Sequence, residues 1–143
     1  MTVERIEFEL KNDPAELDRL AEQLEEFGQR FSMERRCIFE MNLAVDELFT
    51  NIISYGFPDD KDHIVRVVLE SDGHTVTITV EDDGAPFNPL TAKEPDLDMP
   101  LEETPVGGLG IHLCKNMMDN LKYCRCESKN VVTLTKKLDP KKT

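Results

Sequence analysis

The chain has 143 residues, of which 39% are hydrophobic, and its 17 basic and 29 acidic side chains give a net charge of −12. This length suits one domain with its own core and is short for two. The negative charge disfavours direct binding to nucleic acid or to anionic lipid, because both repel an acidic surface. It favours solubility and, more weakly, a basic protein partner.

The sequence indicates a cytoplasmic protein. No apolar run approaches the roughly 20 residues that cross a bilayer, so no membrane segment is expected. The first residues, M-T-V-E-R-I-E, lack the basic and apolar regions of a signal peptide. In a reducing compartment cysteines are expected to be free thiols; the four are Cys37, Cys114, Cys124 and Cys126. Cys124 and Cys126 share a strand face, but a Cys-x-Cys pair without a second ligand pair is a poor metal site.

The N-terminal part of the chain predicts a strand followed by a helix. Apolar and polar residues alternate well enough in residues 3–10 for a strand. Residues 12–14 (N-D-P) supply a cap and a first turn for the helix that follows. The helix then runs to about Phe31, with apolar side chains spaced by three and four residues. Ser32 is expected to cap the next helix in an imperfect capping box.

The next helix is the one around which the chain is organised, and it is predicted to end near Gly56. It has one apolar stripe, made of Ile38, Met41, Val45, Leu48, Ile52 and Tyr55. At about 100° per residue, Glu47 and Asn51 fall together on a polar strip beside that stripe. A carboxylate and a carboxamide at this spacing can hold a water, a metal ion or a hydroxyl between them. The wet edge of an ordinary amphipathic helix can show the same pattern.

Two β-branched alternating runs follow, at residues 64–70 and 75–80, and predict a hairpin. The second run leads into E-D-D-G-A-P-F at residues 81–87. Asp82 is either an ordinary turn carboxylate or an acceptor for an exocyclic amine such as that of adenine, with Gly84 leaving room for the base. Residues 86 and 87, Pro and Phe, would make the segment that leaves this strand rigid and would give the site an apolar wall.

The third part of the chain combines a long loop, a glycine-rich turn and a closing hairpin. Prolines at near-even intervals in residues 88–106 exclude a helix and a central strand, so this loop is expected to be functional or mobile. The glycines of residues 107–110 open a helix expected at 111–120. These glycines either let unpaired backbone N–H groups approach an anion or simply start the helix. Residues 121–126 and 131–138 predict a second hairpin, so the element order favours an α+β fold with helices on one face of a mixed sheet.

Taken in order and spacing, three of these pieces resemble the boxes of the GHKL ATPases, and most closely those of the anti-sigma factor serine/threonine kinases of RsbW type. N-L-A-V-D-E-L-F-T-N-I-I-S-Y-G-F resembles the N-box, E-D-D-G-A-P-F-N-P the first glycine box and G-G-L-G-I-H-L the second. The resemblance covers nearly the whole chain. It implies a two-layer α/β sandwich of the Bergerat type with a mixed, mostly antiparallel sheet, one domain over residues 1–143 and an ATP lid at about 88–106.

The resemblance also implies a role for each site residue. Glu47 would be the general base for the attacking hydroxyl, Asn51 would hold Mg²⁺, and Asp82 would bind the adenine amine of ATP. The further nucleotide-binding residues would be Gly84, Pro86, Phe87, Gly107, Gly108, Leu109 and Gly110. Such a protein suits phosphoryl transfer, in which the enzyme mainly positions the reactants and neutralises charge.

The implied function is a kinase that phosphorylates a serine or threonine of a STAS-type anti-anti-sigma partner and, in an alternate complex, sequesters a sigma factor. The family also suggests a homodimer. The chain differs from the family at the γ-phosphate. Family members often have a basic residue just before the second glycine box, whereas this chain has T-P-V there. Lys93 is the only cation of residues 85–106, so little positive charge is available to stabilise the phosphoryl group. The alternative is an ATP-binding partner-switching module with little or no kinase activity. A histidine kinase is disfavoured, because no helix with a phosphoacceptor histidine precedes the N-box.

Overall fold

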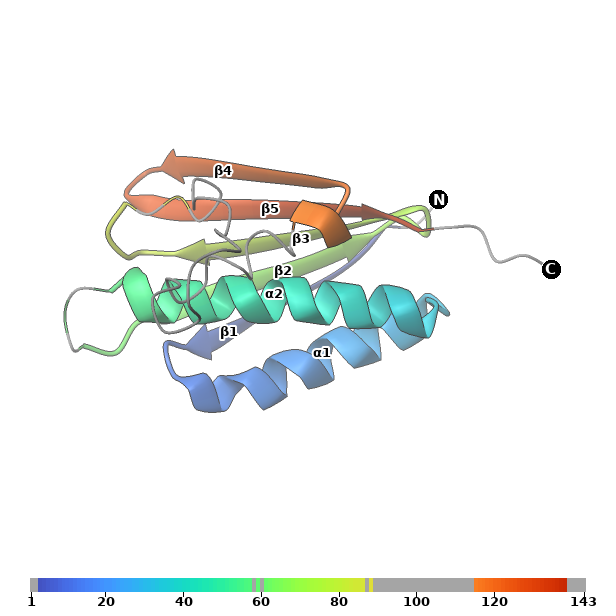
Figure 1. Ribbon diagram of the computed structural model, residues 1–143, viewed down its shortest axis with the longest axis horizontal. Helices are drawn as coiled ribbons and strands as arrows, with labels where there is room; N and C mark the ends of the chain where they lie inside the picture. Colours follow the sequence, from blue (N-terminus) through green and yellow to red (C-terminus); the bar gives the residue numbers. More distant parts are fainter. Residues whose placement is uncertain (1–2, 58, 60, 87, 89–114, 139–143) are drawn as a thin grey trace, which may run out of the picture.

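Five strands and two long helices make up the described part of the computed structural model, which comprises residues 3–57, 59, 61–86, 88 and 115–138 (Figure 1). In chain order the elements are β1 (Glu4–Lys11), the short 3-10 helix η1 (Pro14–Glu16), α1 (Leu17–Arg30), α2 (Arg35–Tyr55), β2 (Ile64–Ser71), β3 (Thr75–Asp82), β4 (Asn120–Cys126) and β5 (Lys129–Lys137). Within these ranges, no helix is both long enough and apolar enough to span a membrane.

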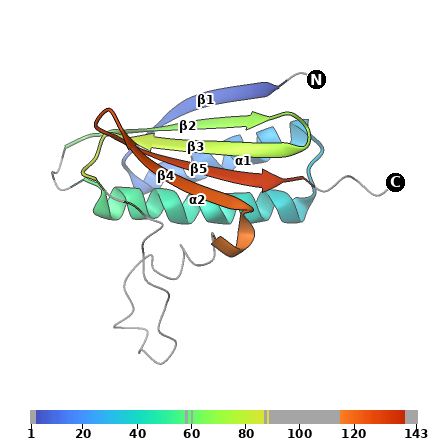
Figure 2. The same ribbon diagram turned by 90° about the horizontal axis from the view of Figure 1, so that it is seen from above.

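The strands form one sheet in the order β1-β2-β3-β5-β4, and each of its four pairings is antiparallel (Figure 2). Both predicted hairpins are confirmed. The turn between β4 and β5 is tighter than expected, because only Glu127 and Ser128 lie between the strands and both have positive φ, 51° and 66°. Such a two-residue turn matches the twist of the strands that it joins.

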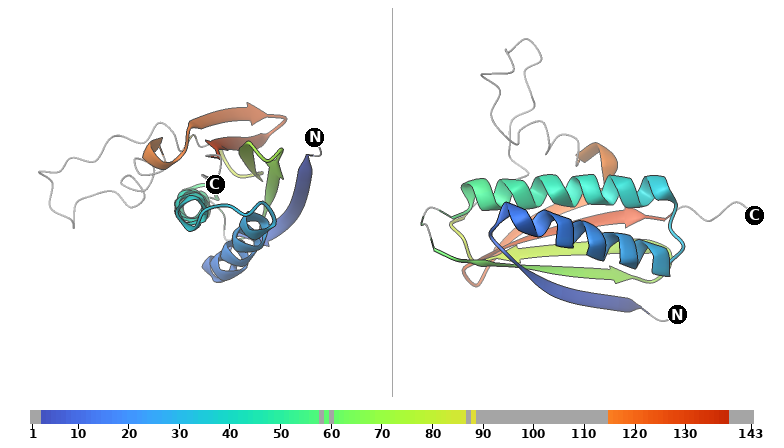
Figure 3. Two further views of the ribbon diagram at one scale, coloured as in Figure 1. Left: turned by 90° about the vertical axis from the view of Figure 1, so that its right-hand side faces the viewer. Right: turned by 90° about the horizontal axis from the view of Figure 1, so that it is seen from below.

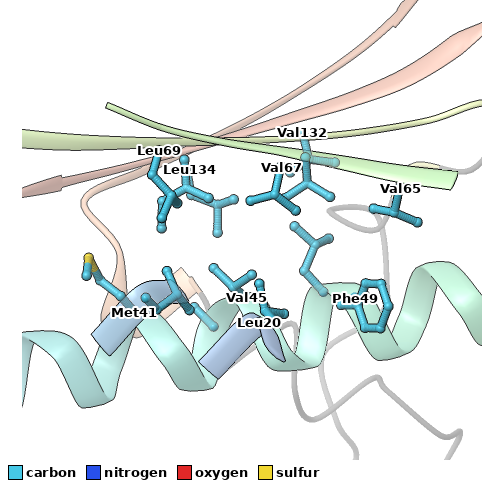
Figure 4. Close-up of a cluster of buried hydrophobic side chains, with 14 of the residues drawn as sticks. Leu20, Met41, Val45, Phe49, Val65, Val67, Leu69, Val132 and Leu134 are labelled. Carbon is cyan, nitrogen blue, oxygen red and sulfur yellow. The ribbon is translucent and has the colours of Figure 1, made fainter. Parts of the chain in front are cut away.

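Both helices cover the same face of the sheet, which confirms the two-layer α+β architecture (Figure 3). Leu20 from α1 and Val45 from α2 point toward strand side chains such as Val67 and Leu134 in the core (Figure 4). The predicted apolar stripe of α2 is buried except at its last member: Tyr55 is 48% exposed. Among the helices of the described residues, none lies on the opposite face of the sheet.

The predicted capping box at Ser32 is wrong. Helix α2 begins at Arg35, its N-cap is Glu34, and no side chain caps it. Ser32 instead lies in the turn that closes α1, with φ 51°, and the next amide, of Met33, donates to the carbonyl of Gly28. The predicted Asp13 cap is present, since the Asp13 carboxylate accepts from Ala15 N at 2.9 Å in front of Pro14, but it caps η1. Helix α1 itself begins at Leu17, after Glu16, and has no side-chain cap.

The helix predicted at 111–120 is described only in part. Residues 115–117 are helical, but residues 111–114 lie outside the described residues. The C-terminal end of that prediction is wrong, since strand β4 already begins at Asn120, where it pairs with Thr135.

The prediction that the cysteines are free thiols is wrong for two of them. Cys124 and Cys126 form a disulfide within β4, with their Cα atoms 5.9 Å apart. Residues two apart on a strand point to the same face, and this proximity lets the two sulfurs join. Cys37 on α2 is half-buried and is not part of this disulfide, whereas Cys114 lies outside the described residues.

Candidate functional site

Helix α2 places Asn51 in a buried position and leaves its oxygen without a partner. Asn51 is 3% exposed, and among the described residues nothing donates a hydrogen bond to its Oδ1. An unsatisfied buried polar group costs about 1–3 kcal/mol, so this oxygen is expected to meet a ligand. A neutral carboxamide oxygen is a ligand that Mg²⁺ accepts. Asn51 therefore fits the magnesium role that the resemblance implies.

Glu47 lies one turn before Asn51 on the same side of α2 and is half-buried. No described residue forms an ion pair with its carboxylate, whereas Glu40, two turns earlier, is paired with Lys136 at 2.8 Å and with Arg36 at 2.9 Å. A carboxylate that is not engaged by a cation stays available as a proton acceptor. This setting is compatible with a general base.

Asp82 ends β3 and is 3% exposed. Its Oδ1 accepts two hydrogen bonds, from Gly84 N at 2.9 Å and from Asn130 Nδ2 at 3.1 Å. Among the described residues no donor reaches Oδ2, which leaves that oxygen for an amine of a ligand. Burial raises the pKa of the Asp82 carboxyl, and the hydrogen bonds from Asn130 and Gly84 oppose this rise.

Three residues of the closing hairpin support Asp82 and its loop, and sequence reasoning missed all three. Asn130 Nδ2 also donates to Ala85 O at 2.8 Å, and the Tyr123 hydroxyl donates to Asn130 Oδ1 at 2.6 Å. Arg125 donates to Gly84 O at 2.7 Å. Asn130 is the residue that pairs directly with Asp82 between β5 and β3. Only this register identifies it, so no local sequence signal was available.

The loop after Asp82 is joined to the end of α2. Ala85 N donates to Gly56 O at 2.9 Å, and Gly56 caps the helix. A Cβ on Gly84 would press on Gly56 O and on Asp82 Oδ1. The glycine therefore lets two backbones approach each other. This contact brings the helix that carries Glu47 and Asn51 against the loop that follows Asp82.

We expect Gly84→Ala to lower the free energy of unfolding by about 1–3 kcal/mol, the usual cost of forcing a carbon into a packed site. Denaturant unfolding measures this. Ala85→Gly, which removes one carbon at the exposed neighbouring position, serves as the control and should change the free energy by about 1 kcal/mol or less. If Gly84→Ala unfolds at the same denaturant concentration as wild type, the loop is not packed against Gly56.

His63 links the loop after α2 to the same region. Its Nε2 lies 2.6 Å from Asp59 Oδ1, its Nδ1 lies 3.1 Å from Asp83 Oδ1, and its ring stacks on Phe57. The hydrogen bond to Asp59, followed by the one to Asp83, raises the pKa of His63 above its ordinary value of 6.5. The His63 hydrogen bond also lowers the pKa of Asp59 below 3.8.

These shifts predict a pH dependence of stability. The stabilisation from protonated His63 is complete below pH 6.5 and is lost as pH rises through the higher pKa of the folded state. The contribution of Asp59 is present above pH 3.8 and is lost as pH falls through its lowered pKa. We expect the melting temperature of wild type to exceed that of His63→Gln most at pH 5–6, by a gap that narrows above pH 7. A gap that is the same at every pH would contradict the role of protonation.

Several predicted site residues are not placed. Phe87, the ATP lid from 89 to 106 and the second glycine box, with Gly107, Gly108, Leu109 and Gly110, lie outside the described residues. Of the first glycine box, Pro86 is described and is exposed at the exit of the loop. The structure therefore brings together α2, the end of β3 and the closing hairpin.

Comparison with known proteins identifies the family. Residues 10–136 match the sequence profile of the histidine kinase-like ATPase domain. The chain belongs to this family. It is 30% identical over 112 residues to serine/threonine-protein kinase BtrW of Bordetella bronchiseptica, a match that covers 78% of this chain and 79% of BtrW. It is 31% identical over 107 residues to the anti-sigma F factor of Clostridium novyi, with 70% of each chain covered.

These relatives confirm that the chain resembles the anti-sigma factor serine/threonine kinases. A solved structure of the RsbU and RsbW domains of Rv1364c from Mycobacterium tuberculosis superposes with a TM-score of 0.65 at 16% identity. It covers 96% of this chain, which spans 33% of that longer protein. At this identity the likeness shows the shared fold.

Proposed function

We propose that this chain is an ATP-dependent anti-sigma factor and protein serine/threonine kinase. In this proposal it phosphorylates a STAS-type anti-anti-sigma partner and, in another complex, sequesters a sigma factor. Family membership supports ATP as the nucleotide, and relatives named as serine/threonine-protein kinase and anti-sigma F factor support the two activities. The single observation that carries the site is the buried Oδ1 of Asn51, which accepts no hydrogen bond from any residue that the structure describes.

Each described residue has a task in this proposal. Glu47 accepts the proton of the attacking hydroxyl, and Asp82 accepts a hydrogen bond from the adenine amine through Oδ2. Asn51 holds Mg²⁺, which when bound would neutralise charge on the phosphates of ATP. Gly84 and Pro86 shape the edge of the base site. Phe87 and the second glycine box at 107–110 complete the nucleotide site, the box with backbone donors for the phosphates.

We further propose that residues 1–143 act as one ATPase domain, with residues 88–106 as its lid. The protein would work in the cytoplasm as a homodimer. Partners would be proteins and not nucleic acid or lipid, in keeping with the net charge of −12.

A partner-switching module without kinase activity is the second candidate. The observation that favours it is the shortage of cations around the lid, since Lys93 is the only one between residues 85 and 106. Charge on a transferring phosphoryl group usually needs such a cation. In this alternative ATP binding alone would select between the sigma factor and its antagonist.

Transfer of labelled phosphate separates the two candidates. The protein is purified from its native cell extract together with its bound partners, and γ-labelled ATP with Mg²⁺ is added. The kinase proposal predicts label on a serine or threonine of a small co-purified protein. If no partner is labelled but ATP changes which partner is retained, the module is correct and the kinase is wrong.

A further inference from the structure

We propose that Cys124 and Cys126 form a thiol–disulfide exchange site whose redox state controls nucleotide binding. The site lies on the edge strand β4, and both cysteines are exposed. The coupling to nucleotide rests on the proposed function, whereas the exchange chemistry does not.

The disulfide is poorly suited to a purely structural role. Its two cysteines are two residues apart. In the chain-entropy model, the stabilisation from a disulfide grows with the length of the loop that it closes, so this very short ring constrains the unfolded chain little. Exposed disulfides are also the ones that exchange with external thiols. Position and separation therefore favour a reversible bond.

The bond holds β4 in a contracted form at this point. Two steps along a regular strand span about 6.4–6.8 Å, whereas the Cα atoms of Cys124 and Cys126 are 5.9 Å apart. Without the bond, the strand is free to extend. The residue between the two cysteines, Arg125, is then expected to shift with the backbone.

Arg125 points to the other side of the sheet, toward the nucleotide site. Cys124 pairs with Val131 and Cys126 with Lys129, while Arg125 pairs with the buried Asn130. Because paired residues share a face and faces alternate along a strand, the disulfide lies on the open face and Arg125 on the helix-covered face.

Two contacts connect this part of β4 to the adenine site. Arg125 donates to Gly84 O at 2.7 Å, within the loop that turns beside Asp82. The preceding inward residue, Tyr123, donates to Asn130 Oδ1 at 2.6 Å, and Asn130 donates to Asp82 Oδ1. The oxidised strand would thus hold Gly84 and Asp82 in place. Reduction would loosen both and weaken nucleotide binding.

The exchange reaction balances with a dithiol as the reductant. A thiolate of the dithiol attacks one sulfur of the Cys124–Cys126 bond, forms a mixed disulfide and releases the other cysteine as a thiolate that takes up a proton. The second thiolate of the reductant then attacks the mixed disulfide and releases the remaining cysteine. Two electrons and two protons reach the protein, and the reductant leaves as a disulfide. Oxidation reverses these steps with a disulfide as the electron acceptor.

The first test counts thiols and does not involve nucleotide. Protein treated with a disulfide oxidant, or with dithiothreitol, is denatured, alkylated and mapped by mass spectrometry. We expect the peptide with Cys124 and Cys126 to take up no label after oxidation and two labels after reduction, while Cys37 is labelled in both samples. Two labels on that peptide after oxidation would overturn the exchange site.

The second test measures the affinity for Mg-ATP in the two redox states. Coupling between sites usually changes affinity by about fivefold or more, and we expect the reduced protein to bind more weakly by such a factor. The double variant Cys124→Ser/Cys126→Ser should have the affinity of reduced wild type in both states. Cys37→Ser is the matched control and should keep the response.

Arg125→Gln separates the proposed link from a general effect of the disulfide. It should still form the bond but should no longer respond to reduction. Equal affinity of oxidised and reduced wild type would overturn the coupling while leaving the proposed function intact. Absence of ATP binding in both states would contradict the proposed function and the coupling together, and the thiol count would still decide the exchange site.

Discussion

Replacing Glu47 by glutamine should reduce phosphoryl transfer to the protein partner by about 10²- to 10⁴-fold, the usual contribution of a general base. Glutamine keeps the size of the side chain but cannot accept the proton of the attacking hydroxyl. ATP affinity should remain within a few-fold of wild type, because Glu47 is not assigned to the nucleotide. Single-turnover transfer from labelled ATP, measured beside a binding titration, separates the two effects.

Asp46→Asn is the matched control for this variant. Asp46 is the preceding residue of α2, is likewise half-buried, and burial raises the pKa of its carboxyl. It is not assigned to the reaction, so its replacement should leave transfer within a few-fold. A wild-type transfer rate for Glu47→Gln would make Glu47 an ordinary carboxylate at the edge of the helix. An equal loss in both variants would indicate a general disturbance of α2.

Asp82→Asn should abolish measurable ATP binding or weaken it by one to two orders of magnitude. A hydrogen bond to a charged group contributes about 1.5–3 kcal/mol, and the amide can present a donor to the adenine amine where the carboxylate accepts. The two existing bonds to Oδ1, from Gly84 and Asn130, would hold the amide with its oxygen in that place and its NH₂ toward the base. Calorimetry with Mg-ATP measures the change.

Asp83→Asn tests whether the loss is specific. Asp83 follows Asp82, is exposed and contacts His63. Its replacement removes one charge from the same loop and should leave ATP affinity within a few-fold. If Asp82→Asn binds ATP as wild type does, then Asp82 does not contact the base. If both variants lose affinity equally, the loss follows from the charge of the loop.

Much of the fold could be predicted because periodicity reports burial. Apolar and polar residues alternate in β2 and β3, and apolar residues recur every three or four positions in α1 and α2. These patterns predicted the correct elements. Capping was harder to predict. Ser32 has the right residue type for an N-cap, but the turn that closes α1 uses it with positive φ, and the helix begins without a side-chain cap.

The site was predictable only where its residues lie within recognisable local motifs. Glu47, Asn51 and Asp82 come from motifs, although the spacing on α2 placed Asn51 on a polar strip and did not indicate that it is 3% exposed. Asn130 and Arg125 depend on the pairing of β5 with β3 and with β4, which composition does not specify. The Cys124–Cys126 bond was not predicted, because the reducing compartment disfavours disulfides in general and does not account for two cysteines held side by side on one strand.

Titration of wild type and Asn51→Ala with ATP, in the presence of Mg²⁺ and in the presence of a chelator, tests the central claim most directly. The claim is that the buried oxygen of Asn51 binds Mg²⁺, and that Asn51 and Asp82 belong to the same nucleotide site. Wild type should bind one ATP per chain and bind it more tightly with Mg²⁺, whereas Asn51→Ala should lose most of the difference that Mg²⁺ makes. Loss of a side chain that only hydrogen-bonds a metal ligand already costs about 10- to 100-fold in metal affinity, so loss of Asn51, which is assigned as a ligand, should cost at least as much. Absence of ATP binding to wild type, or an unchanged response to Mg²⁺ in Asn51→Ala, would contradict this account.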